Sequence, residues 1–222
     1  MRIKLTILSI TLVILFSPFP AKAFNYTVGV SAGYNSGPGV YLNGELSDFA
    51  RNFPFKIRLG AGYTIVSNPG NALDARRIFI NNATNGRPEK AGWMWDLRMD
   101  LLYRVHWFKL TDLFFYGGPR YNFFTANFNF VDGNEDFDIT SNHWGWGMGL
   151  SKTFRITRQF DLQLDSGLDY YLPSTIYGHD TSYNPDNENV NPREDYTYND
   201  ADVAINQPKF SFRIMMGIGY HF

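Results

Sequence analysis

The C-terminal segment of the chain, residues 209–222, alternates large apolar side chains with small, polar or charged ones without interruption. A period of two places successive side chains on opposite faces of a β-strand. The segment is therefore predicted to be a strand with one apolar face, and its aromatic end suggests that this face is turned to lipid rather than to a soluble core. The apolar parity is Phe210, Phe212, Ile214, Met216, Ile218, Tyr220 and Phe222.

The first 23 residues have the three parts of a secretory signal peptide. Arg2 and Lys4 form a short basic region, residues 5–19 are mostly apolar, and Ala21-Lys22-Ala23 is a small-x-small cleavage site. A transmembrane anchor is the alternative, but it needs about 20 apolar residues, and this run is shorter and interrupted by prolines. We predict a signal peptide over residues 1–23 and one outer-membrane β-barrel domain over residues 24–222.

The composition fits a membrane barrel better than a soluble domain. Aromatic residues make up 18% of the chain and charged residues also 18%, as expected where aromatic girdles flank a lipid-facing band. The chain has no cysteine, which excludes disulfides, thiolate metal sites and cysteine nucleophiles. After residue 23 it carries four more acidic than basic residues, so a basic nucleic-acid surface is not indicated.

Eight segments have the alternation and length of outer-membrane strands, which need about 9–11 residues each. In the clearest of them, Asp96, Arg98, Asp100 and Arg104 face inward while tryptophan, leucine, methionine and tyrosine face lipid. The predicted fold class is all-β: an eight-stranded antiparallel up-and-down transmembrane β-barrel. Its predicted strands are residues 24–35, 40–47, 55–65, 93–105, 113–123, 142–154, 160–172 and 209–222.

The connections between these strands sort by length. Periplasmic turns are short and external loops long in such barrels, so both ends of the barrel domain are predicted to lie in the periplasm. Within the first long loop, residues 71–83 can form a short surface helix capped by Asn71. The long connections 67–92, 131–141 and 173–208 all fall at one end, and the connections 48–54, 106–112 and 155–158 all fall at the other.

The fifth segment continues its alternation beyond the length needed to cross the membrane. Its apolar side chains then lie on the inward parity and would need cover from the loops. A β-bulge at Gly117-Gly118 is the alternative interpretation. The side chains that would need cover are Phe124, Ala126, Phe128 and Phe130.

Aromatic side chains gather at both ends of the predicted strands, as the two girdles of an outer-membrane barrel do. The predicted outer girdle is Trp93, Trp95, Trp144, Trp146, Tyr63 and Tyr170, and the predicted inner girdle is Phe55, Phe154, Phe160, Tyr220 and Phe222.

The inward parity carries nearly balanced charge. Eight strands enclose a lumen that side chains can just fill, and a buried charge without a partner costs several kcal/mol. We therefore expect a lumen plugged by mutual ion pairs; a conducting pore is the alternative, although a selective one would favour one sign of charge. The inward cations are Lys56, Arg58, Arg98, Arg104, Arg120, Lys209 and Arg213, and the inward anions are Glu45, Asp96, Asp100, Asp161, Asp165 and Asp169.

Candidate catalytic groups are few. Ser141 and His143 share one face at the outer end of the sixth strand, and His179, Asp180 and Ser182 cluster in the last loop. Acyl transfer would need a nucleophile and a base within hydrogen-bond reach, and a mobile loop is a poor place for a preorganised triad. Loss of lipid A modification in Ser141→Ala or His143→Ala would favour an enzyme.

Two further motifs have ordinary explanations. The alternating glycines Gly145, Gly147 and Gly149 lie on one face of a strand, which indicates room for bulky lumen neighbours rather than a phosphate loop. Acidic residues in the last loop could ligate Ca²⁺, although their spacing matches no EF-hand and solvated acids are more common. These acids are Asp186, Glu188, Glu194, Asp195, Asp200 and Asp202.

The terminal Tyr220-His221-Phe222 resembles the closing strand of bacterial outer-membrane barrels, and the chain after residue 23 is similar in pattern to the small OmpA/OmpX/OmpW-like barrels. This resemblance implies an outer-membrane location, contact with outer-membrane lipid and lipopolysaccharide, and recognition of the last strand by the barrel-assembly machinery. It carries over no catalytic motif. The lipid A deacylases carry His-x-Ser on a strand, whereas Ser141 and His143 have the reverse order.

The function predicted from these observations is non-enzymatic. The barrel would serve a structural or surface-interaction role through loops 67–92, 131–141 and 173–208, which could bind an extracellular ligand. A narrow porin-like channel for small solutes is the alternative, and an outer-membrane lipid-modifying enzyme comes third. We predict no catalytic, cofactor-binding or metal-binding residues, no cofactor and no nucleic-acid partner.

Overall fold

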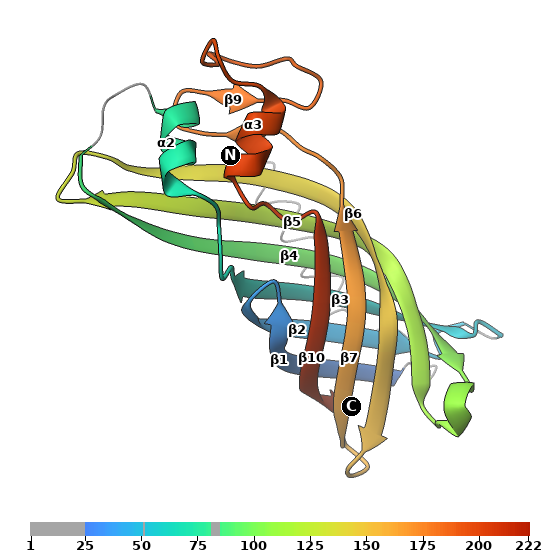
Figure 1. Ribbon diagram of the computed structural model, residues 1–222. Coiled ribbons are helices and arrows are strands. Elements are labelled where there is room, and N and C mark those ends of the chain that lie inside the picture. Colours follow the sequence, from blue (N-terminus) through green and yellow to red (C-terminus); the bar gives the residue numbers. More distant parts are fainter. Residues whose placement is uncertain (1–24, 51, 81–84) are drawn as a thin grey trace, which may run out of the picture.

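A computed structural model describes residues 25–50, 52–80 and 85–222, so the predicted signal peptide lies outside the described residues. The described chain forms a tilted barrel with a small helical structure at one end (Figure 1). Its barrel strands are β1 (Asn25–Asn35), β2 (Pro38–Ser47), β3 (Phe55–Ile65), β4 (Arg87–Val105), β5 (Leu113–Val131), β6 (Asp136–Arg155), β7 (Phe160–Tyr171) and β10 (Phe210–His221).

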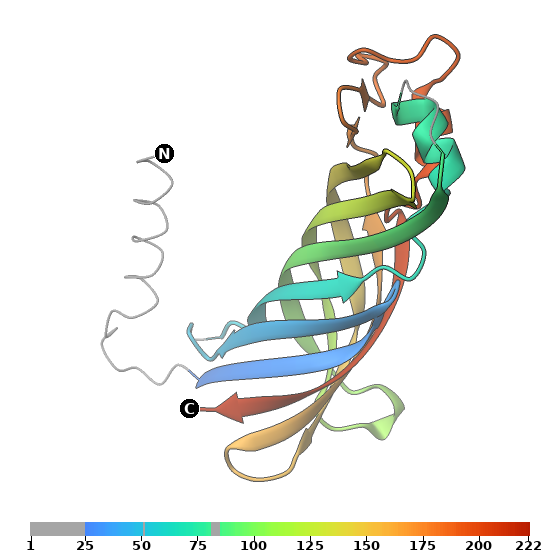
Figure 2. The same cartoon turned by 90° about the vertical axis from the view of Figure 1, so that its left-hand side faces the viewer.

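The eight strands close on themselves. Each pairs antiparallel with its neighbours in the order β5-β4-β3-β2-β1-β10-β7-β6, and β5 also pairs with β6. The closing pair places Thr27 opposite His221, so both ends of the barrel domain lie at one rim, opposite the small helical structure (Figure 2). The predicted all-β, eight-stranded, antiparallel up-and-down barrel is confirmed. None of the described helices is long and apolar enough to cross a membrane.

The outside of the barrel is apolar along its middle and aromatic at its ends. Of the predicted outer girdle, Trp95, Trp144, Trp146 and Tyr170 are more than half exposed. At the opposite rim, the Tyr220 ring packs edge-on against Phe160 and Phe222. This exterior would be unstable in water and is stable only against lipid.

Three strands are longer than the sequence pattern predicted. β4 begins at Arg87, β5 runs to Val131, and β6 begins at Asp136. The boundaries predicted for the long loops 67–92 and 131–141 are therefore wrong, because these strands continue to pair above the membrane. The β-bulge at Gly117-Gly118 is also wrong, since the register of β5 with β6 runs unbroken through both residues.

The upper halves of β4, β5 and β6 are covered on their inner face by a cap. The cap comprises residues 66–80 and 173–208, which include α2 (Ala72–Phe79), β8 (Ile176–Tyr177), β9 (Ser182–Tyr183) and α3 (Tyr198–Ala204). It lies above the long strands and away from the other rim (Figures 1 and 2). The only other described helix is the short turn η1 (Trp107–Lys109) at that rim.

The cap has its own apolar core. The four inward side chains of β5 that needed cover are fully buried and pack with Ile78 and Phe79 of α2 and with Ala201 and Ile205 around α3. The predicted helix within 71–83 is confirmed, but it ends at Phe79. Its N-cap is Asn71, whose side-chain oxygen accepts hydrogen bonds from the backbone N–H groups of Leu73 and Asp74. The covered side chains are Phe124, Ala126, Phe128 and Phe130.

The start of α3 is held by a reciprocal cap that should respond to acid. The Thr197 hydroxyl and backbone N–H both donate to the Asp200 carboxylate, at 2.6 and 2.8 Å, and they lower the pKa of this carboxyl below its ordinary value. Because the folded pKa is the lower one, the contact is intact at neutral pH and is lost as the pH falls through it. We expect α3 amide protection to be constant down to about pH 4 and to fall below that. Asp200→Ala should abolish this step, and loss of protection at a higher pH would contradict the assignment.

Candidate functional site

The middle of the lumen is filled by an ion-pair network. Arg58 of β3 pairs with Glu45 of β2 at 2.7 Å and, across the barrel, with Asp165 of β7 at 2.8 Å. Its guanidinium also donates to the Ser151 hydroxyl at 2.9 Å. The network forms because the period-two pattern directs the polar face of every strand into one narrow space.

Nearer the cap, Asp169 of β7 is the common partner of three arginines. Its carboxylate lies 3.6 Å from Arg98, 2.9 Å from Arg120 and 3.2 Å from Arg213. Arg120 also pairs with Asp100 at 2.7 Å. Three cations around one buried anion are tolerated because the neighbouring acids share them.

Asp96 closes the network toward the cap. Its carboxylate accepts hydrogen bonds from the Tyr41 hydroxyl at 2.6 Å, the Tyr171 hydroxyl at 2.9 Å and the Asn122 amide at 2.8 Å. Tyr116, lower in the lumen, accepts from Arg213 and donates to the Ser166 carbonyl. Tyr116 and Tyr171 are members of the network that charge alone does not predict, although their inward parity could have identified them.

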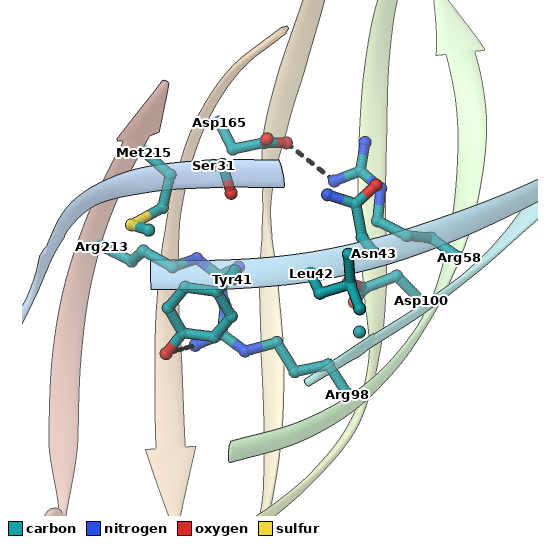
Figure 3. A pocket seen from close by; sticks show the side chains of 11 residues that line it. Ser31, Tyr41, Leu42, Asn43, Arg58, Arg98, Asp100, Asp165, Arg213 and Met215 are labelled. Atoms are coloured by element: carbon teal, nitrogen blue, oxygen red, sulfur yellow. Dashed lines mark hydrogen bonds and ion pairs between the residues drawn. The ribbon is translucent and has the colours of Figure 1, made fainter. Parts of the chain in front are cut away.

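The space left inside this network is very small. A cavity of about 30 Å³ lies between Tyr41, Arg58, Arg98, Asp165 and their neighbours (Figure 3). One water needs about 10–15 Å³ by this measure, so the cavity has room for about two waters. The predicted ion-paired lumen is confirmed for its central residues.

Three predicted members of the network lie at its edges and pair elsewhere. Arg104 pairs with Asp112 at the exposed lower rim, and Lys209 pairs with Asp202 of α3. Asp161 pairs with His221 at 2.6 Å. Each stands at a strand end, where the nearest polar partner belongs to a turn, to the cap or to the end of β10.

The alternating glycines of β6 make room for the network, as predicted. A side chain at Gly147 would meet the Asp169 carboxylate at 2.0 Å, and one at Gly149 would meet the Tyr116 hydroxyl at 2.4 Å. They face the lumen opposite bulky neighbours. A phosphate loop is excluded by their place within one continuous strand.

We expect the refolded protein to be silent in a planar bilayer. The ion pairs and tyrosines leave no more than water-sized gaps at mid-lumen, and opening a path would break buried ion pairs. Single-channel recording measures this directly, with protease resistance and a heat-dependent shift in gel mobility showing that the barrel has folded. Reproducible conductance steps from a folded sample would contradict the plugged lumen.

Ser141 and His143 meet as their parity predicts. The Ser141 hydroxyl lies 2.7 Å from His143 Nε2, and His143 Nδ1 lies 3.0 Å from the Leu172 carbonyl oxygen. Because a carbonyl only accepts, Nδ1 carries the proton and Nε2 accepts from serine. This is the hydrogen-bond order of an activated nucleophile, but both side chains are only 1% exposed. A substrate therefore has no access to the serine in this conformation.

The other candidate residues are dispersed. His179 and Asp180 form an exposed pair at 2.9 Å, whereas Ser182 is buried in β9. Asp200 caps α3, and Asp202 accepts from Lys209 and Gln207. Within the described residues, no cluster of three or more His, Asp or Glu side chains is arranged to hold a metal ion.

The chain is similar to three solved structures of bacterial surface proteins. A major outer membrane protein from Thermus thermophilus matches with a TM-score of 0.72 and 24% identity, over 90% of this chain and 100% of that chain. Neisserial surface protein A matches with a TM-score of 0.45 and 12% identity, over 92% of this chain and 100% of that chain. Ail, the attachment invasion locus protein of Yersinia pestis, matches with a TM-score of 0.46 and 12% identity, over 90% of this chain and 97% of that chain.

No family model matches the chain, and no curated protein matches its sequence. The likeness to the Thermus protein concerns the fold, and it extends over nearly the whole barrel. With a closed antiparallel sheet, a lipid-facing apolar band and a filled polar lumen, the chain is a small eight-stranded β-barrel protein of the bacterial outer membrane.

Proposed function

We propose that the protein is a non-enzymatic outer-membrane protein whose closed barrel displays the cap for contact with molecules outside the cell. The observation that carries this proposal is the apolar core joining the cap to the upper halves of β4, β5 and β6. A loop of the length of residues 173–208 would ordinarily be mobile, whereas this one is folded onto a sheet that rises above the membrane.

A folded cap is suited to recognition because little conformational entropy remains to be lost on binding. Its outer surface is polar and acidic: residues 173–208 contain seven acidic side chains and one basic side chain, Arg193. Exposed apolar and aromatic side chains such as Tyr177 and Val190 interrupt this polar surface. Such a mixture of aromatic and hydrogen-bonding groups is typical of binding surfaces.

The test is a chain in which residues 67–85 and 173–207 are replaced by short Gly-Ser turns. Cells that carry this variant should adhere less to surface polymers and to one another than cells that carry the full chain, while the barrel still folds. Adhesion counts and heat-dependent gel mobility measure the two properties separately. Unchanged adhesion and unchanged envelope integrity in cells with a folded, capless barrel would refute the surface role.

The two other candidate functions are less well supported. A narrow channel conflicts with the water-sized cavity at mid-lumen. A lipid-modifying enzyme would need access to the Ser141 hydroxyl, which is buried between the barrel and the cap. Both of these functions need a path for a solute or a substrate through the protein, and neither the lumen nor the site of Ser141 provides one. A surface role needs no such path.

A further inference from the structure

An apolar turn projects from the rim opposite the cap. It comprises residues 106–112, between β4 and β5, and includes η1, the green coil at the lower right of Figure 1. The side chains of Trp107, Phe108 and Leu110 are 49%, 81% and 43% exposed. Three apolar side chains this exposed on one short turn are unfavourable in water, so the turn is expected to meet an apolar medium.

The turn bends toward the lipid side of the barrel wall rather than toward the lumen. The centroid of the Trp107 ring lies 6.4 Å from that of Phe115, and Phe115 is an exposed member of the lipid-facing parity of β5. Trp107 therefore extends the lipid-facing surface beyond the ends of the strands. This is the depth of the lipid headgroups, where tryptophan is enriched in membrane proteins.

The backbone of this turn is held in an unfavourable conformation. Phe108 and Lys109 have φ values of 56° and 57°, in the left-handed region that side chains with a Cβ atom disfavour. Glycine would adopt the same backbone without strain. Strained residues are concentrated at binding and catalytic sites, so a phenylalanine and a lysine in these positions indicate that their side chains are used.

A lysine of the next strand along the wall is tied to the turn. Lys152 of β6 has the same outward parity as Leu150, and its ammonium lies 4.4 Å from the centroid of the Phe154 ring. Its Nζ donates to the carbonyl oxygens of Thr111 and Thr153, at 2.6 and 2.7 Å. An ammonium group has three N–H donors, and these contacts use two of them. The third remains for a ligand at the edge of the lipid-facing surface.

The rim around Lys152 is basic. The segments 106–112 and 152–158 contain one acidic residue, Asp112, which already pairs with Arg104 at 3.3 Å. A basic surface beside exposed aromatic rings, at the depth of the headgroups, favours lipids with a net negative charge. The four basic residues of the two segments are Lys109, Lys152, Arg155 and Arg158.

We propose that this rim binds the phosphodiester headgroup of an anionic phospholipid in the leaflet that faces the periplasm. The third N–H of Lys152 donates to a phosphate oxygen, and Lys109 adds a second positive charge to the site. The rings of Trp107 and Phe108 pack against the acyl chains next to the headgroup. The site lies at the opposite end of the barrel from the cap and is independent of the surface role proposed for the cap.

Fluorine NMR of the refolded protein, labelled with 5-fluorotryptophan and placed in nanodiscs, tests this site directly. Trp107 is the reporter at this rim, and Trp107→Phe assigns its resonance. As phosphatidylglycerol replaces phosphatidylcholine with the same acyl chains, the Trp107 resonance should shift and saturate at a low fraction of phosphatidylglycerol. The other four tryptophans meet the same lipids and should shift only in proportion to that fraction. They belong to the outer girdle and are Trp93, Trp95, Trp144 and Trp146.

Removing either lysine should weaken the binding of phosphatidylglycerol. Lys152→Gln and Lys109→Gln should each raise the half-saturating fraction about fivefold, the effect of one basic residue near an anionic lipid surface. The matched control is Arg77→Gln, which removes an exposed charge from α2 and should leave that fraction unchanged. Phe108→Gly suits the left-handed backbone. It should also raise the half-saturating fraction, and it serves if a lysine variant fails to fold.

Glycerol phosphate added to phosphatidylcholine nanodiscs supplies the anion without acyl chains and should leave the Trp107 resonance in place. Three results would overturn the proposal: an equal Trp107 shift with glycerol phosphate, a Trp107 shift no larger than those of the other tryptophans, and an unchanged half-saturating fraction in the folded variants. The first would show that the rim binds free phosphate. The other two would show that no phospholipid is held there.

Discussion

Arg120→Met should destabilise the barrel by about 3–5 kcal/mol, because removing one member of a buried charge network leaves its partners unpaired. The Arg120 side chain is fully buried and pairs with Asp100 at 2.7 Å and with Asp169 at 2.9 Å. It also donates to the backbone carbonyls of Gly118 and Pro119. These carbonyls lie where β4 and β5 keep their register but two successive residue pairs between Arg98 and Leu101 are unpaired. The substitution therefore removes a buried charge and also the hydrogen bonds that Arg120 donates to the backbone of β5.

Urea unfolding of the refolded protein, followed by tryptophan fluorescence, measures this loss. The matched control is Arg104→Met, because Arg104 forms an exposed ion pair with Asp112 at 3.3 Å. Exposed pairs contribute about 0–1 kcal/mol, so the control should unfold close to the wild-type midpoint. Equal midpoints for the two variants would mean that the lumen network contributes no more than a surface pair.

Phe128→Ala should loosen the cap while leaving the membrane-embedded barrel intact. The Phe128 side chain is fully buried in the cap core and its ring centroid lies 5.7 Å from that of Phe137. Truncating a buried phenylalanine to alanine costs about 3–5 kcal/mol. Phe128 lies above the membrane-crossing part of β5, so this cost falls on the attachment of α2 and α3.

Hydrogen exchange of the α2 and α3 amides, together with limited proteolysis within residues 184–189, would report the loosening. The control is Val203→Ala on α3, since Val203 is 82% exposed and packs little of its surface. We expect faster exchange and cleavage for Phe128→Ala only. If both variants retained wild-type protection, the cap would be held by contacts other than its apolar core.

The barrel could be predicted from sequence because period-two alternation determines both the strand and the face that meets lipid. In 93–105 and 209–222 this signal is strong, and the structure has strands at both. Strand ends were less predictable. Residues 87–92 and 136–141 lie above the membrane, where the outward side chains become polar, and only the pairing of β4, β5 and β6 with one another makes them strands.

The sequence predicts which charged residues lie in the lumen, but not which of them form ion pairs with one another. Parity alone brought Arg58, Glu45 and Asp165 to one space, but which carboxylate each arginine chooses depends on the register of strands far apart in sequence. Similarly, the contact of Ser141 with His143 follows from their spacing, whereas their burial depends on how the cap folds. The cap itself, apart from α2, has no periodic signal in the sequence.

The unequal height of the barrel wall gives the molecule a sheltered and an open side. β5 has 19 residues and β1 has 11, so the tall side continues for roughly 27 Å farther along the strand than the short side. With the cap outside the cell, as proposed above, a large particle such as an antibody would arrive from above and meet the cap and the tips of β5 and β6. Molecules confined to the bilayer plane arrive below this obstruction, at the short side. The tall side that carries the cap and the short side of the barrel wall (Figure 2) would thus be reached by two populations of molecules that do not compete for the same approach.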